Sequence, residues 1–326
     1  MSELALAAYA AETGGHVLAP PRDARWAAFA RAFGERAYRA ELAAKGFRFV
    51  ARSDAQFPPL LRAVHDPPPG LFVRGAADVE LLARRGVAVV GARACSPYGA
   101  HVARTLGREL AAAGLVVISG LARGVDGEAH RGALEAAGAT VAVLGCGIDR
   151  DYPTSHRALA AEIARTGLLV SEYAPGVEPA PWRFPARNRI VAGLAAATVV
   201  VEAREASGAL ITADLALEEG REVFAVPGEI TAALSKGTNG LLRVGAAPLT
   251  AASDVLESFG LVGPAPAPPP ATGPAAVVLA RLRDTSATAD ELVRATGLDA
   301  GSVAVALTEL ELAGLCAGSE GRYRVL

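Results

Sequence analysis

The sequence has few of the residues that cross-link a protein or anchor it in a membrane. Its three cysteines, Cys95, Cys146 and Cys316, are scattered and form no CxxC pair, which argues against both a disulfide framework and a zinc site. No run of about 18 apolar residues occurs, and the N-terminus lacks the basic-then-apolar pattern of a signal peptide. We therefore expect a cytoplasmic protein that does not bind a membrane.

An excess of charge of one sign is also missing. Lys and Arg together number 32 against 34 Asp and Glu, so any nucleic-acid site must be a local patch. The only lysines are Lys45 and Lys236, and the remaining basic residues are arginines. A GC-rich genome produces the same bias, so the arginine content alone predicts no function.

The sequence is instead dominated by short apolar runs that alternate with segments of helical spacing. This alternation indicates βαβ units and a Rossmann-like, doubly wound, mainly parallel α/β sheet. Ligands of such sheets bind outside the carboxyl ends of the strands, so the loops that follow the strands are the places to search for chemistry. The expected strands are residues 87–90, 115–118, 140–144, 168–170, 196–201 and 222–226.

Composition divides the chain into four predicted parts. Residues 259–273 are rich in Pro and Ala, which predicts an extended linker. Beyond it, three helical segments and a hairpin that turns at Ser319-Glu320-Gly321 predict a winged helix. The four parts are a short N-terminal helical extension (1–45), the Rossmann-like domain (46–258), the linker (259–273) and the C-terminal winged-helix domain (274–326).

Two loops at the ends of expected strands pair glycine with arginine. The first begins at Gly91 and carries Arg93, and the second is Ser119-Gly120 followed by Arg123. Glycine lets the backbone approach a ligand closely, the N-terminus of a following helix attracts anions, and arginine presents a fork that suits phosphate. Neither loop has the GxGxxG or GxxxxGK[ST] pattern, so dinucleotide binding and NTP hydrolysis are disfavoured.

The segment 182–189 interleaves aromatic residues with arginines and one asparagine. Aromatic rings stack on unpaired bases while guanidinium groups hold the backbone, which is the combination that single-strand binding uses. The structural alternative is an arginine packed on Trp182 at the surface.

The segment 236–240 is a flexible stretch that could close over a ligand. His130 and Cys146 have no assignable catalytic partner, and we expect both to be structural.

These segments belong to a longer series that closely resembles the DNA-processing protein A family (DprA, also called Smf). The resemblance covers residues 42–258 in unbroken order, and the C-terminal winged helix matches a common arrangement of the family. The matching segments are Phe57–Leu61, Val89–Arg93, Ser119–Asp126, Leu144–Gly147, Tyr152-Pro153, Phe184–Ile190, Ser207–Leu210, Glu222–Gly228 and Lys236–Asn239.

The resemblance implies a protein without enzymatic activity or nucleotide cofactor that binds single-stranded DNA regardless of sequence. It also implies a homodimer that loads the RecA recombinase onto DNA taken up in natural transformation. Members often carry Ser or Thr where this chain has Ala92 and Cys95, and their N-terminal sterile-alpha-motif-like unit is shortened here. Carried over, the DNA- and phosphate-binding residues are Gly91, Ala92, Arg93, Ser119, Gly120, Arg123, Phe184, Arg187, Asn188, Arg189, Lys236 and Asn239, with Trp182 as a second stacking candidate.

Two other functions stay open. One is hydrolysis of a nucleoside monophosphate, as in the Rossmann-like enzymes that activate cytokinin ribotides, which use a Pro-Gly-Gly-x-Gly-Thr loop and a downstream Glu. The corresponding stretch here is Ser207–Thr212 with Glu218 and Glu219, and the middle glycine is replaced. The other is a purely regulatory protein whose tail recruits a partner while the core is vestigial.

The winged helix and the end of the main domain each carry a further expectation. The would-be recognition helix, residues 299–315, contains Asp299, Glu309 and Glu311 but no Lys or Arg. A helix that enters a DNA groove is normally basic, so we expect this domain to contact protein. The apolar segment 241–256 supplies either a symmetric dimer face or ordinary core packing.

Overall fold

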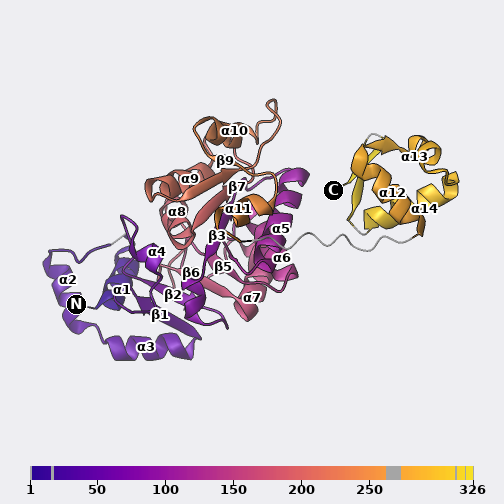
Figure 1. The fold of residues 1–326 in the computed structure, drawn as a ribbon. Helices are drawn as coiled ribbons and strands as arrows, with labels where there is room; N and C mark the ends of the chain where they lie inside the picture. The colour runs from indigo at the N-terminus through magenta and orange to yellow at the C-terminus, as the bar shows by residue number, and fades with distance from the viewer. Residues whose placement is uncertain (1, 16–17, 262–272, 313, 320, 326) are drawn as a thin grey trace. The chain divides into compact units, whose positions relative to one another are not determined.

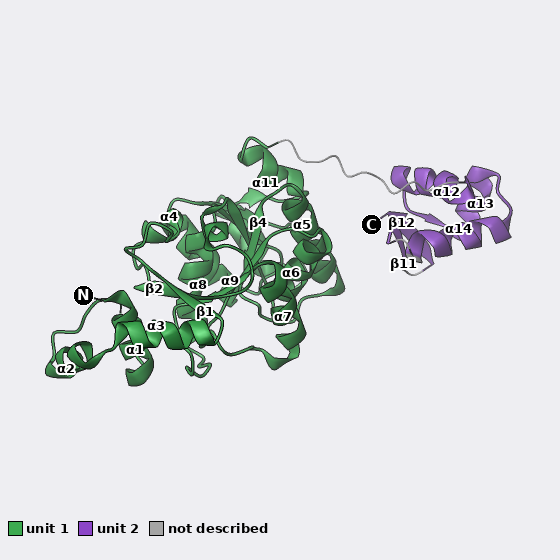
Figure 2. Ribbon diagram, turned by 90° about the horizontal axis from the view of Figure 1, so that it is seen from below, with its two compact units in different colours: residues 1–264 green, residues 265–326 purple. Residues whose placement is uncertain are grey.

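The computed structural model describes residues 2–15, 18–261, 273–312, 314–319 and 321–325. The chain forms two compact units, Met1–Pro264 and Ala265–Leu326, which are green and purple in Figure 2. Each unit has its own hydrophobic core. The bounds of the four predicted parts stay predictions, and residues 262–272 of the predicted linker lie outside the described residues.

Unit 1 is built on a nine-stranded sheet in the order β1-β2-β6-β5-β4-β3-β7-β8-β9 (Figure 1). Strands β3 to β9 run parallel to one another, and β1 and β2 add an antiparallel edge next to β6. The predicted Rossmann-like, mainly parallel α/β fold is therefore confirmed. The strands are β1 Phe47–Ala51, β2 Gly70–Arg74, β3 Gly86–Val90, β4 Val116–Ser119, β5 Thr140–Val143, β6 Leu168–Ser171, β7 Ala197–Val200, β8 Glu222–Ala225 and β9 Ala247–Pro248.

Helices cover both faces of this sheet because its central strands are apolar on both sides. In β3, Val87 and Val89 pack into the cluster that contains α5 and α6, whereas Ala88 and Val90 pack into the cluster that contains α8 and α9. The helices that follow the N-terminal region are α4 Pro59–Arg62, α5 Pro97–Ala112, α6 Val125–Glu135, α7 Arg157–Thr166, α8 Arg183–Leu194, α9 Gly208–Glu218, α10 Lys236–Arg243 and α11 Ala252–Ser258, with 3-10 turns at Val79–Ala83 and Thr154–His156.

Three helices precede the sheet: α1 Glu3–Thr13, α2 Ala24–Ala32 and α3 Glu35–Ala44. The predicted N-terminal helical extension spans residues 1–45, and all three helices fall in that range. Leu4 and Ala7 of α1 join the cluster formed by Phe49 and Phe72 of the antiparallel edge. The N-terminal helices therefore pack onto β1 and β2.

The apolar segment 241–256 contributes to the interior of unit 1. Leu241 is buried on one side of the sheet, and Leu249, Val255 and Leu256 are buried on the other. These side chains favour the core-packing interpretation of the segment, and the homodimer stays a prediction. Among the described residues, no helix combines the length and apolar character that crossing a bilayer requires.

Unit 2 has the winged-helix arrangement of three helices and a small sheet in the order β10-β12-β11. Its core contains Leu279, Leu292 and Leu307, one from each helix. The predicted hairpin corresponds to the antiparallel pair β11 and β12, although residue 320 of its turn lies outside the described residues. The elements are α12 Gly273–Asp284, β10 Ala287–Thr288, α13 Ala289–Thr296, α14 Ala300–Leu312, β11 Cys316–Ser319 and β12 Arg322–Val325.

Candidate functional site

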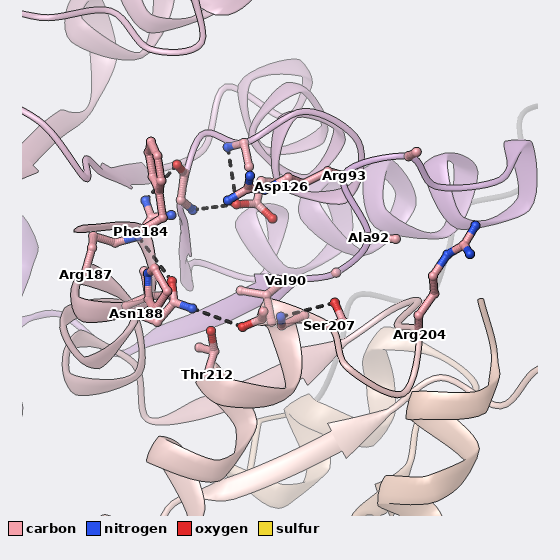
Figure 3. A pocket seen from close by; sticks show the side chains of 18 of the residues that line it. Val90, Ala92, Arg93, Asp126, Phe184, Arg187, Asn188, Arg204, Ser207 and Thr212 are labelled. Atoms are coloured by element: carbon pink, nitrogen blue, oxygen red, sulfur yellow. Dashed lines mark hydrogen bonds between the residues drawn. The ribbon is translucent and has the colours of Figure 1, made fainter. Parts of the chain in front are cut away.

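A pocket of about 300 Å³ lies at the carboxyl edge of the parallel sheet, between β3 and β7 (Figure 3). The strand order reverses there, since β4, β5 and β6 lie on one side of β3 while β7 and β8 lie on the other. Such a switch point opens a crevice because the loops leaving the two strands diverge. The lining comes mainly from the loop after β3 (90–94), from α8 (184–191) and from the segment entering α9 (204–212).

Arg187 forms the floor of the pocket. Its guanidinium is fully buried and donates from Nη1 to the carbonyl of Gly120, at 2.8 Å, and to that of Val143. Burial lowers the pKa of Arg187, while the nearby carboxylate of Asp126 opposes that shift. Arg187 therefore joins α8 to the ends of β4 and β5 and fixes the pocket shape.

Asp126 is the carboxylate that lines the pocket, and the backbone already engages it. Its Oδ2 accepts from the amides of Gly120, at 3.1 Å, and Ala122, at 3.3 Å. Burial raises the pKa of Asp126, and Arg187 and the two amides oppose that shift. These bonds hold the loop after β4 in place, which is a structural role.

The N-terminus of α5 is occupied by a side chain of the protein itself. The buried carboxylate of Glu202 accepts from the amide of Ser96, at 2.8 Å, and from its hydroxyl, at 2.5 Å. A Cβ at Gly99 would collide with the same carboxylate. The amide of Ala92 donates to the Glu202 carbonyl, at 2.7 Å. The Ala92 amide is therefore not free to bind a phosphate, contrary to the prediction for the Gly91-Ala92 backbone. The N-terminus of α5 already faces the carboxylate of Glu202, so its dipole is not free to attract a phosphate either.

The rim of the pocket carries cations and an aromatic ring. The guanidinium carbon of Arg93 lies 5.4 Å from the centroid of the Phe184 ring. Arg204, on the loop after β7, is exposed on the opposite side of the pocket in Figure 3. Within the described residues, no carboxylate lies within 4.0 Å of either arginine. Both cations are thus open to an anionic ligand.

The structure brings together a majority of the sequence-predicted residues. Asn188 also joins two walls of the pocket, because its Nδ2 donates to the Gly208 carbonyl, at 3.0 Å. The predicted residues that line the pocket are Gly91, Ala92, Arg93, Gly120, Phe184, Arg187 and Asn188.

Two predicted residues are buried in internal contacts away from the lining. Ser119 donates to the Val89 carbonyl, at 2.6 Å. Arg189 forms a buried ion pair with Glu172, with 2.7 Å between Nη2 and Oε2. Both pairs satisfy polar groups inside the protein, and the predicted contacts of Ser119 and Arg189 with DNA have no counterpart in the pocket.

Three further predicted residues lie outside the lining. Arg123 is exposed, and the helix that follows it is tied to the first loop by the bond from Val125 N to Ala92 O, at 3.2 Å. Lys236 is also exposed, next to Gly237, whose amide donates to the carbonyl of residue 203. Asn239 makes two bonds to the backbone of residue 228, so it holds a loop together.

Sequence reasoning missed Arg204 and Glu202. Arg204 follows the end of β7 much as Arg93 follows the end of β3, but no glycine lies between β7 and Arg204, so the pairing of glycine with arginine did not mark it. Glu202 had no such signal, because its partner Ser96 lies 106 residues away along the chain.

The residues weighed as catalytic groups are unsuited to catalysis. His130 is buried and bonded to Thr140, at 2.7 Å, and burial lowers its pKa to about 3. Burial also raises the pKa of the Cys146 thiol to about 11. Within the part of the chain that the structure describes, no cluster of His, Cys, Asp or Glu is arranged to hold a metal ion.

Comparison with known families assigns both units. A family model described as DNA recombination-mediator protein A matches residues 48–260, and one described as DprA winged helix domain matches residues 262–322. The chain belongs to the DNA-processing protein A (DprA/Smf) family. The DprA family thus accounts for the Rossmann-like unit and for the winged helix.

Individual members of the DprA family match over much of their length. The chain is 41% identical to the putative DNA processing protein DprA of Mycobacterium tuberculosis over 302 residues, which is 86% of this chain and 78% of the relative. It is 40% identical to protein Smf of Escherichia coli over 284 residues, or 83% of this chain and 75% of that protein.

Two solved DprA structures share the fold. The X-ray structure of DprA from Streptococcus pneumoniae superposes with a TM-score of 0.67 at 37% identity, covering 78% of this chain and 92% of that one. A Helicobacter pylori structure, described as giving insight into the single-stranded DNA binding mode of DNA processing protein A, has a TM-score of 0.59 at 32% identity. It covers 65% of this chain and 95% of that one.

Proposed function

We propose that this protein binds single-stranded DNA, regardless of sequence, at the switch-point pocket. The observation that carries the proposal is the rim itself, where Arg93 and Arg204 stand without carboxylate partners among the described residues and Phe184 lies beside Arg93. The description of the Helicobacter pylori relative by its single-stranded DNA binding supports the same ligand.

The chemistry of the rim suits a single strand better than a duplex. Guanidinium groups attract phosphates of any sequence, and an aromatic ring stacks on any unpaired base. Bases in a duplex are already stacked and paired, so their faces are not free to stack on the ring of Phe184. Gly91, Ala92, Gly120, Arg187 and Asn188 shape the pocket, whereas the exposed Arg123 and Lys236 lie outside its lining.

We also propose that the protein acts by binding rather than by catalysis, with no cofactor. The competing function, hydrolysis of a nucleoside monophosphate, would bring a downstream Glu, here Glu218 or Glu219, close to the Ser207–Thr212 stretch. Ser207 caps the start of α9, whereas Glu218 and Glu219 lie at its end, about 16 Å along the helix axis. In addition, Glu219 accepts a bond from the amide of His65. The alternative is not favoured.

The wider role follows from the family. We propose that the protein processes DNA in natural transformation as a homodimer in the cytoplasm, and that it loads the RecA recombinase onto the incoming strand. Ile230 and Val244 are exposed and offer apolar surface for such a dimer, although Leu241, Leu249, Val255 and Leu256 of the segment 241–256 are buried.

For the winged helix we propose a protein contact. Its helix α14 contains no Lys or Arg, and it exposes Ala304, Val305 and Glu309. An acidic and apolar helix face repels a phosphate backbone and suits a protein surface.

Fluorescence anisotropy with a labelled oligothymidylate and with a labelled duplex of equal length tests the proposed function. We expect the single strand to bind more tightly than the duplex, and strands of different sequence to bind alike. Equal or tighter binding of the duplex would contradict the proposal, and release of free base from AMP would support the enzymatic alternative instead.

A further inference from the structure

Tyr152 extends the aromatic surface of the pocket outward. Its ring stacks on that of Phe184, with 5.3 Å between centroids and 26° between planes. Phe184 is partly covered, whereas Tyr152 is 42% exposed. Arg93, Phe184 and Tyr152 therefore form a continuous surface, which we call the ledge, that runs from the cationic rim to an exposed tyrosine.

Two carboxylates that precede Tyr152 anchor the turn that carries it. Asp151 forms an ion pair with Arg74 at the end of β2, with 2.5 Å between Oδ1 and Nη2. Asp149 accepts from the amide of Gly176, at 2.9 Å. A ring held in this way loses little conformational freedom when a ligand stacks on it.

Beyond the ledge lies a second hollow of about 510 Å³, to which Tyr152 contributes one wall. Its two arginines are offset by three carboxylates, because Arg150 pairs with Asp149 and Glu178, and Arg157 pairs with Asp151. The hollow has room for a base but does not attract phosphate strongly. A ligand there would be held by stacking, and the attraction for its backbone would come from Arg93.

We propose that Tyr152 is a base-stacking residue that holds a nucleotide adjacent to the one at the pocket. The occupant is the next nucleotide of the same strand, because the ledge is continuous with the rim through Phe184 and because the local charge favours a base over a phosphate. This inference rests on the proposed single-strand binding and deepens it, since it extends the binding path to the hollow beside Tyr152.

The test compares Tyr152→Ala and Tyr152→Phe with the wild type on two ligands. One ligand is an oligothymidylate, and the other is a strand of equal length made of abasic residues, which keeps the phosphates and removes the bases. Tyr152→Ala is expected to weaken binding of the oligothymidylate by about 5- to 100-fold, the range of base stacking on an aromatic ring, and Tyr152→Phe to preserve it. Both variants should bind the abasic strand as the wild type does, with an unchanged salt dependence.

The abasic strand also distinguishes a Tyr152 that stacks on a base from a Tyr152 that only positions its neighbours. If Tyr152 merely positioned Phe184 and Arg93, or if Tyr152→Ala were misfolded, binding to both ligands would fall together, and that result overturns the inference. Wild-type affinity of Tyr152→Ala for the oligothymidylate also overturns it, while single-strand binding itself stands. A wild-type protein that binds neither ligand overturns the proposed function together with this inference.

Discussion

The guanidinium of Arg187 lies against the α-carbon of Gly120, and a Cβ at residue 120 would come within 2.6 Å of the guanidinium carbon. Arg187 can therefore reach the carbonyls at the ends of β4 and β5 only because residue 120 has no side chain. The floor of the pocket depends on this contact, which joins two of the loops that the sequence places at the sheet edge.

Replacement of Gly120 by Ala should displace Arg187 and disturb the pocket. Overpacking of this kind lowers the free energy of unfolding by about 1–3 kcal/mol, and we expect weaker binding of single-stranded DNA as well. Urea unfolding measures the first effect. Gly208→Ala is the matched control, because a Cβ there meets nothing within 4 Å, and it should not lower the free energy of unfolding. Equal stability of both variants would contradict the role given to Gly120.

Glu202 should stabilise the start of α5 and the loop that carries Arg93. Glu202→Ala removes the acceptor for the Ser96 amide and an anion at the helix N-terminus, which together cost about 1–2 kcal/mol. Chemical denaturation checks the loss, and anisotropy checks the weaker single-strand binding that a looser loop implies. Glu205→Ala, an exposed carboxylate on the same segment as Glu202, serves as the control. An unchanged unfolding midpoint for Glu202→Ala would rule out this role.

Much of the fold follows from local sequence, and the exceptions have physical causes. The strands β3 to β8 are short apolar runs buried on both faces, a pattern readable without partners. Helix α1 shows no apolar stripe of helical period, because Leu4, Ala5, Leu6 and Ala7 are all buried, so its bounds within the predicted helical extension could not be read from the sequence. Strands β1 and β2 were not predicted, and the pairing of β1 with β2 and of β2 with β6 identifies them.

Some residues of the candidate site could likewise be predicted from local sequence, whereas the contacts of others could not. Arg93 and Phe184 were found because glycine and aromatic patterns mark them locally. The burial of Arg187 and Arg189 could not be read from the sequence, since it depends on carbonyls and a carboxylate from other elements. A motif shows only that an arginine is present. The three-dimensional contacts of that arginine decide whether its guanidinium binds DNA or another group of the protein.

Buried His130 should make stability depend on pH. In the unfolded chain its pKa lies near 6.5, whereas burial lowers the folded pKa to about 3. Between these values the unfolded state binds a proton that the folded state excludes, so the free energy of unfolding falls as the pH drops. The loss between about pH 7.5 and about pH 5.5 is about 1.4 kcal/mol.

Urea unfolding of the wild type and of His130→Gln at both pH values isolates this effect. The free energy of unfolding of the variant should change less with pH than that of the wild type, because the contribution of His130 is missing, whatever the absolute stability of the variant. Asp126, whose pKa is raised by burial, contributes with the opposite sign and equally in both proteins, so it cancels in the comparison. Identical pH slopes for the two proteins would be inconsistent with a neutral, buried His130.

Removal of the winged helix should leave single-strand binding largely intact. A chain that ends after Leu261 keeps α11 and the side chains of Phe259 and Leu261 that pack on the unit 1 core. Because α14 carries no basic residue, we expect the truncated and full-length proteins to bind an oligothymidylate with similar affinity. Loss of most of the affinity on truncation would show that unit 2 contacts DNA.

The central claim, that the cationic rim of the switch-point pocket holds the phosphates of a single strand, is tested most directly by the salt dependence of binding. Affinity for an oligothymidylate is measured over a range of salt concentrations for the wild type, Arg93→Ala and Arg36→Ala, an exposed arginine of α3. We predict that Arg93→Ala weakens binding to all sequences alike and reduces the slope of log affinity against log salt by about 0.7, while Arg36→Ala changes neither. If Arg93→Ala had the same affinity and the same salt dependence of binding as the wild type, that result would contradict the central claim.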